Sequence, residues 1–214
     1  MKKVVTATLL VLLTGLACGP SSRITSSWTA SGISNNGYRK IIVLALLREP
    51  DRGLREKMEQ HLVGDLRNIG YDAICSCDEY NPKAFENMNE EQSIAKLRGS
   101  GVDAVVTIVL LDKTKEKMYV PGRVIYSPYY QYHNHFWSYS RSMYNRINVQ
   151  GYYEENTRYF WESNFYDLTQ NNLLYSAQSQ SFDPPNAETM GHEYGMMITR
   201  DMVKKGLLKE TAAR

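Results

Sequence analysis

The first half of the chain alternates between apolar runs and segments with helical periodicity. Residues 41–47 and 102–111 are almost entirely apolar, and residues 71–77 form a shorter run of strand-like composition. Apolar runs of this length are typical of strands that are buried on both faces of a sheet. We therefore predict three buried strands in these ranges.

Two helices are predicted between these strands. In residues 51–69 apolar side chains recur every four positions, which predicts a helix with one buried face, and Gly70 ends the segment. Asn89 stands three residues before Gln92, a spacing at which the two side chains can cap the start of a second helix. Strand–helix–strand–helix–strand order predicts crossover connections and a largely parallel sheet.

The second half of the chain has a different pattern. Residues 146–153, 157–168 and 173–182 alternate between apolar and polar positions, and a polar turn between the last two predicts a hairpin. A final helix is predicted after Asn186, with a buried side made of Met190, Tyr194, Met197, Ile198 and Met202. The predicted fold class is α/β: a mixed sheet with a βαβαβ start, an antiparallel hairpin or meander, and a C-terminal helix, with the helices packed on the sheet.

The N-terminus predicts export and a lipid anchor. Two lysines precede an apolar run over residues 4–16, which is shorter than the about 20 residues that cross a bilayer core. Cys18 follows a small residue, as in bacterial lipoproteins, so residues 1–17 are predicted to be a signal peptide and Cys18 to carry acyl chains such as palmitate. Because Gly19 and not an acidic residue follows, the outer membrane is favoured, with the domain facing the periplasm or the cell surface.

Behind the anchor the composition predicts a tether and one domain. Residues 18–38 are rich in Ser, Gly and Asn and are predicted to be a flexible tether. Residues 39–214 are predicted to form a single α/β domain with an aromatic-rich insert at about 121–144. Removal of Lys2 and Lys3 with the signal peptide reduces the 25 basic residues to 23, equal to the 23 acidic ones. This balance gives nucleic-acid binding no electrostatic support.

The domain carries few candidates for chemistry. Cys75 and Cys77 would lie on the same face of one strand, where neighbouring positions are poorly placed to pair. We therefore predict two small buried residues, in preference to a redox or metal pair. The chain has no phosphate loop, no Gly-x-Ser-x-Gly elbow and no His-Glu-x-x-His helix. No cofactor and no catalytic residue is predicted.

The insert at 121–144 is the main candidate for binding. Tyr and Trp give rigid contact area and are favoured in interfaces, so the candidate binding residues are Tyr126, Tyr129, Tyr130, Tyr132, Trp137 and Tyr139. The alternative is a loop that covers its own sheet. His133 and His135 alternate on the same segment and are weak metal candidates, because no carboxylate or thiol lies close by in sequence.

Three segments and the region around Cys18 resemble a family of bacterial envelope lipoproteins. These segments are residues 38–73, 100–122 and 162–184, and the tyrosine-rich insert completes the match. The resemblance implies a small α/β domain similar to the N-terminal domain of the translocation protein TolB. Similar domains occur in curli-secretion lipoproteins and in lipoprotein activators of penicillin-binding proteins. Those relatives bind other proteins or assemble, so the resemblance implies no catalysis.

Together these observations predict a membrane-anchored envelope lipoprotein that is not an enzyme. It would bind an envelope protein or a copy of itself. One alternative is a module that binds glycan or peptidoglycan through the aromatic insert. A second is a hydrolase, which would need His133 or His192 close to an acid and a hydroxyl.

Replacing Cys18 by Ser should abolish lipidation, because the thiol that receives the acyl chains is lost. We expect the full chain to incorporate labelled palmitate in a bacterial host and to fractionate with membranes, and Cys18→Ser to do neither. Cys77→Ser is the control and should keep the label. An unlipidated N-terminus on membrane-bound wild-type chain, detected by mass spectrometry, would contradict the prediction.

Overall fold

The computed structural model describes residues 21–32, 37–47, 51–80, 84–85, 87–120 and 151–210. The predicted signal peptide, Cys18, and the candidate residues of the aromatic insert lie outside these ranges. Within them, no helix is long and apolar enough to cross a membrane. The chain divides into two compact units, of which the smaller comprises residues 114–157.

The predicted parallel part of the sheet is confirmed. β2 (Lys40–Leu46) pairs in parallel with β3 (Asp72–Cys75) on one side and with β4 (Ala104–Val120) on the other. The connections contain α2 (Arg52–Asn68), the short α3 (Ser76–Glu79) and α4 (Glu90–Gly99). The capping of α4 is also confirmed, since the Asn89 side chain accepts from the backbone N–H of Gln92 and the Gln92 side chain accepts from that of Asn89.

The antiparallel part extends the sheet through β4, β5 (Tyr152–Asp167) and β6 (Asn172–Phe182), in the strand order β1-β6-β5-β4-β2-β3. Both β4 and β5 are longer than predicted. Beyond residue 111 the side chains of β4 are mainly charged and none is buried. This part of the strand therefore has no apolar pattern from which it could be predicted. The final helix is α6 (Ala187–Lys204), capped by the Asn186 side chain.

The predicted tether is wrong over residues 22–29. This segment forms β1 (Ser22–Thr29), an edge strand that pairs antiparallel with β6. Hydrogen bonding between the backbones of two strands does not require apolar side chains. The buried hydroxyl of Ser22 forms a hydrogen bond with that of Ser181 at 2.8 Å. The Ser-rich composition that indicated a tether is therefore compatible with a strand at the edge of the sheet.

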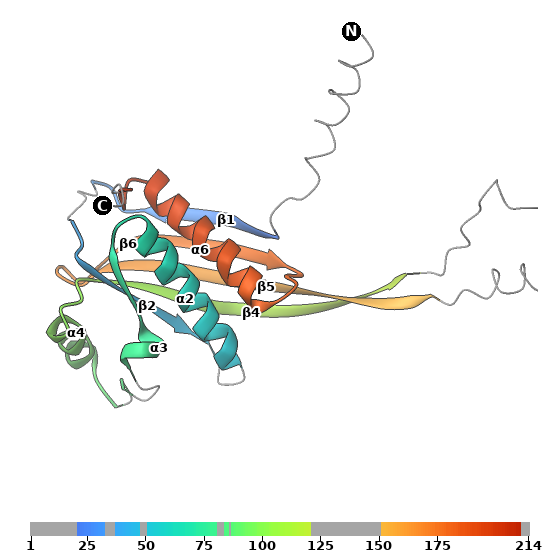
Figure 1. Cartoon of the computed structure of the whole chain (residues 1–214), viewed down its shortest axis with the longest axis horizontal. Helices are drawn as coiled ribbons and strands as arrows, with labels where there is room; N and C mark the ends of the chain where they lie inside the picture. Colours follow the sequence, from blue (N-terminus) through green and yellow to red (C-terminus); the bar gives the residue numbers. More distant parts are fainter. Residues whose placement is uncertain are drawn as a thin grey trace, which may run out of the picture. The chain divides into compact units, whose positions relative to one another are not determined.

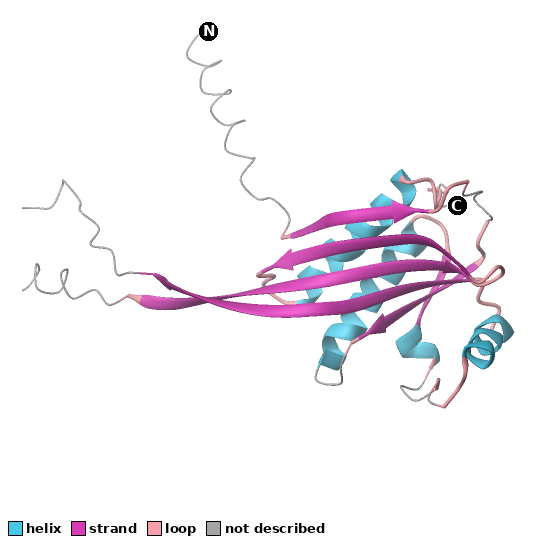
Figure 2. Ribbon diagram, turned by 180° about the vertical axis from the view of Figure 1, so that it is seen from behind, coloured by secondary structure: helices cyan, strands magenta, loops and turns pink. Residues whose placement is uncertain are grey.

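Helices α2 and α6 lie side by side on one face of the sheet (Figure 1). The main core lies beneath them, and its largest fully buried side chains include Trp161, Tyr175, Tyr194, Phe165, Met58 and Leu62. A smaller cluster on the opposite face joins Ile42 and Val105 to Leu97 of α4. In the opposite view the strands lie nearer to the viewer and α2 and α6 lie behind them (Figure 2). The two helical crossovers thus cover opposite faces of the parallel strands.

Close packing of α2 against α6 depends on two glycines of α6. A Cβ atom at Gly195 would overlap Oδ2 of Asp65 and would lie 3.2 Å from the backbone of His61. A Cβ atom at Gly191 would lie 2.8 Å from the His61 ring. A side chain at either position would overlap a side chain of α2 and would also press on the α2 backbone, so glycine lets the two helix backbones approach at this crossing.

Gly195→Ala should destabilise the protein. The clash costs about 1–3 kcal/mol, which exceeds the about 0.5–1 kcal/mol that alanine contributes to a helix. Gly64→Ala on α2 is the matched control, because its new methyl group would meet nothing within 4 Å. We expect Gly64→Ala to raise the unfolding midpoint of the full chain and Gly195→Ala to lower it, measured by circular dichroism. If the two substitutions changed the unfolding midpoint equally, the close approach of α2 and α6 at Gly195 would not limit the size of the side chain there.

Candidate functional site

Glu59 is a fully buried carboxylate at the edge of the sheet where β2 and β3 end. It lies on the core-facing side of α2, and its side chain has no exposed surface. Its oxygens accept hydrogen bonds from the backbone N–H groups of Ala45 (2.8 Å) and Cys77 (3.0 Å). They also accept from the hydroxyl of Ser76 at 3.0 Å. One side chain therefore joins α2 to the ends of two strands and to α3.

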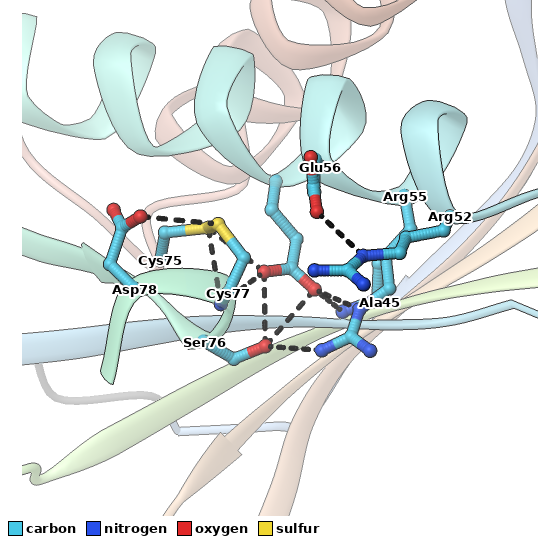
Figure 3. A network of polar contacts seen from close by, with 9 residues as sticks. Ala45, Arg52, Arg55, Glu56, Cys75, Ser76, Cys77 and Asp78 are labelled. Carbon is cyan, nitrogen blue, oxygen red and sulfur yellow. Dashed lines mark hydrogen bonds and ion pairs between the residues drawn. A yellow bond between two sulfur atoms is a disulfide. The ribbon is translucent and has the colours of Figure 1, made fainter. Parts of the chain in front are cut away.

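Arg55, one helical turn before Glu59, supplies the counter-charge. Its Nε lies 3.0 Å from Oε1 of Glu59, and a terminal nitrogen donates to the Ser76 hydroxyl at 3.2 Å (Figure 3). A carboxylate removed from water is tolerated when it is paired and its oxygens are hydrogen-bonded. Both conditions are met here, and Arg55 itself keeps 22% of its side-chain surface exposed.

The prediction that Cys75 and Cys77 remain unpaired is wrong. The two residues form a disulfide with a Cα–Cα distance of 5.1 Å. The strand-based argument fails because β3 ends at Cys75 and α3 starts at Ser76, so the two cysteines do not lie on one extended segment. The turn brings the Cys77 sulfur back to that of Cys75, which is also the N-cap residue of α3.

The Cys75–Cys77 disulfide contributes little to the stability of the fold through loop closure. In the chain-entropy treatment, closing a loop of three residues stabilises the fold by about 1.6 kcal/mol, compared with about 3 kcal/mol for a loop of 15 residues. The Glu59 hydrogen bonds already hold the same turn. Loop closure therefore does not by itself account for a disulfide at this place.

A pocket of about 410 Å³ lies beside this network. Its lining includes Leu46, Leu47, Arg55, Ser76, Tyr80 and Phe85. β3 and β4 flank β2 on opposite sides, so the connections diverge at the carboxyl ends of these strands. Such divergence points are where α/β sheets commonly bind ligands. Among the described residues, this pocket joins an apolar lining to the buried polar network.

Glu59, Cys75 and Cys77 also form the group of potential metal donors whose ligand atoms lie within 4.8 Å of one another in the described part of the chain. A metal would require both sulfurs as thiolates. The disulfide removes these two ligands, so the oxidised form offers one carboxylate alone. No cofactor is assigned to this group.

A second polar cluster lies between α2 and α6. His61 meets Glu188 at 2.8 Å, and its ring centroid lies 5.8 Å from that of His192. Burial raises the pKa of Asp65, and the charges of His192, His61 and Arg200 oppose this shift. Hydrogen bonds among the described residues bring no hydroxyl to either histidine. The hydrolase alternative, which needs a hydroxyl beside His133 or His192, therefore stays an untested prediction.

The smaller unit contains a two-stranded ribbon, which we define as residues 114–120 and 151–157. None of these residues is buried. Four large apolar side chains are more than half exposed: Met118 (55%), Tyr119 (54%), Tyr152 (61%) and Tyr153 (73%). Because adjacent strand positions point to opposite faces, both faces of the ribbon carry exposed apolar groups.

Cross-strand contacts define the ribbon. The Lys115 ammonium lies 2.6 Å from the Glu155 carboxylate, and Lys117 lies 3.6 Å from it. A hydrogen bond from Lys115 and its positive charge lower the pKa of Glu155. The rings of Tyr119 and Tyr153 lie 5.2 Å apart. Such exposed pairs contribute modestly, so the ribbon is stabilised mainly by backbone pairing.

Three of the residues that matter, Glu59, Tyr152 and Tyr153, were missed by the sequence analysis. Glu59 had a signal, since it interrupts the apolar stripe of α2 next to Met58 and follows Arg55 by one turn. Tyr152 and Tyr153 lie beyond the predicted insert, on a strand that was predicted to be ordinary sheet. The structure does not describe the six predicted aromatic residues of the insert, nor His133 and His135, so their roles stay predictions.

Glu59→Gln should destabilise the fold by about 2–4 kcal/mol, because an amide nitrogen would face donors and Arg55 would lose its partner. Glu56→Gln on the same helix is the control. Its pair with Arg52 is exposed, so the change should cost less than about 0.5 kcal/mol. Urea unfolding of the full chain measures both. A Glu59 effect as small as that of Glu56 would contradict a structural role for the network.

No protein-family model matches the chain, and no curated protein matches its sequence. Solved structures with a similar fold include a PelC dodecamer from Paraburkholderia phytofirmans. It is 9% identical with a TM-score of 0.46, and the match covers 83% of this chain and 95% of PelC. Lipoprotein GNA1162 from Neisseria meningitidis is 14% identical with a TM-score of 0.43, over 78% of this chain and 98% of its own. The likeness to these two structures is distant and concerns the fold alone.

Proposed function

We propose that this chain is a lipid-anchored protein of the cell envelope, held at the outer membrane through Cys18, that acts as a non-enzymatic protein-binding or assembly module. The ribbon of residues 114–120 and 151–157 is its binding surface, and the tyrosines predicted in the insert would add to it. The observation that carries the proposal is the exposure of Met118, Tyr119, Tyr152 and Tyr153.

A ribbon without buried side chains supports this role on energetic grounds. An isolated pair of strands is marginally stable in water, because it has no apolar face covered by other groups. Large apolar side chains exposed together on a surface mark sites of interaction. A partner that covers Tyr152 and Tyr153 would remove apolar area from water and stabilise the ribbon at the same time.

A second copy of the chain is the partner that we propose. The ribbon carries both signs of charge, with Lys115 and Lys117 on one strand and Glu155 on the other. A surface of this kind can be complementary to itself. The mature chain has 23 basic and 23 acidic residues, so copies would not repel one another through net charge.

Two copies with different affinity tags, co-expressed as full chains and extracted in mild detergent, test the proposal. We expect them to co-purify, and the triple variant Tyr119→Ser/Tyr152→Ser/Tyr153→Ser to lower co-purification by about tenfold, since buried aromatic side chains dominate interface energies. Phe182→Ser is the matched control, because Phe182 is 44% exposed at the end of β6 in the other unit.

Failure of the wild-type copies to co-purify would overturn the proposed self-assembly. Circular dichroism of the triple variant should match that of the wild type, because none of the replaced side chains is buried. The Tyr119–Tyr153 pair could also stack on a sugar. Tyrosine fluorescence that changes on addition of cell-wall fragments, without co-purification, would replace protein binding by glycan binding.

A further inference from the structure

The two sulfurs of the Cys75–Cys77 disulfide have different surroundings. Cys75 is 2% exposed, and its Sγ lies 2.9 Å from Oε2 of Glu59 and 3.3 Å from the backbone nitrogen of Cys77. Cys77 is only partly buried, and its Sγ lies 3.7 Å from the exposed carboxylate of Asp78. An accessible sulfur bonded to a buried sulfur that has its own polar partners is an arrangement suited to thiol–disulfide exchange.

We propose that the Cys75–Cys77 disulfide is redox-active and oxidises dithiols on other protein segments. Cys77 is the sulfur that is attacked, and Cys75 is the sulfur that leaves. This activity departs from the non-enzymatic role proposed above and is independent of it, because it rests on different residues, in the larger unit of the chain.

In the first step a thiolate of the incoming segment attacks Sγ of Cys77. A bond forms between these two sulfurs, the Cys75–Cys77 bond breaks, and its electron pair goes to Sγ of Cys75. The N–H of Cys77 faces that atom but also donates to Oε2 of Glu59. The negative charge of this carboxylate opposes a thiolate at Cys75, so the leaving sulfur takes up a proton as the bond breaks. Once protonated from solvent, the Cys75 thiol can donate a hydrogen bond to Glu59, whose Oε2 is 2.9 Å away.

In the second step the other thiolate of the segment attacks its own sulfur in the mixed disulfide. A disulfide forms within the segment, and Cys77 leaves as a thiolate that takes up a proton. In sum the segment loses two electrons and two protons, and Cys75 and Cys77 gain them. One chain therefore oxidises one dithiol before another disulfide must reoxidise it.

The surroundings indicate which dithiols fit. Asp78 and Glu79 are exposed directly after Cys77, so positive charge near the incoming thiol would be favoured. The apolar pocket that includes Leu46, Leu47 and Phe85 also contains Ser76, the residue between the two cysteines. We therefore expect an extended segment whose cysteines are flanked by lysine and apolar residues.

Mixing the oxidised full chain in detergent with a reduced synthetic peptide, which has two cysteines flanked by Lys and Leu, tests the proposal. Mass spectrometry after thiol alkylation should find one peptide disulfide and two new protein thiols per chain. A peptide with Glu in place of Lys should react about tenfold more slowly. The native circular dichroism spectrum should persist throughout.

Two single-cysteine variants test the roles of the two sulfurs. With the peptide supplied as a mixed disulfide, Cys75→Ser, which keeps Cys77, should form a stable adduct at least about tenfold faster than Cys77→Ser, which keeps the buried Cys75. Cys18 is present in both variants, so any adduct formed at Cys18 is the same in both. Equal adduct formation would overturn the assignment of Cys77. A wild-type disulfide that stays oxidised in excess peptide while the protein is folded would overturn the proposal, whether or not the variants fold.

Discussion

The buried carboxylate of Glu59 is the constraint on which the carboxyl edge of the parallel strands depends. A charge out of water must be met by donors, and here they come from β2, from the start of α3 and from Arg55 of the same helix. Each donor fixes the position of its own backbone. The end of β3, the turn into α3 and the disulfide are therefore defined by one side chain of α2.

The elements that bury apolar surface could be predicted from the sequence. The runs at 41–47 and 102–111 have the continuous apolar composition of strands buried on both faces, and the apolar stripe of α2 has the period of a helix. The core needs these side chains to fill the space under α2 and α6. β1 and the outer parts of β4 and β5 have no such requirement. Their order comes from backbone pairing with a neighbouring strand, which no side-chain pattern reports.

The site was harder to predict for a related reason. Whether Cys75 and Cys77 can pair depends on where β3 ends, and an error of one or two residues in that boundary reverses the answer. The boundary is set by Glu59, which is 16 residues away from Cys75 in sequence. A contact of this separation cannot be seen from local spacing. Glu59 itself had a local signal, as a charge within an apolar stripe, but its partners did not.

The two units differ in what holds them together, and this difference bears on function. The larger unit has a continuous core under α2 and α6, so exposed groups near the disulfide can change without loss of the fold. The ribbon has no buried side chain, so its order responds directly to whatever covers Tyr152 and Tyr153. The binding proposed for the ribbon can therefore be tested with substitutions that leave the core intact. The exchange proposed at Cys77 has the opposite requirement, because the position of the Cys75 sulfur depends on Glu59 and hence on the packing of α2 against the sheet.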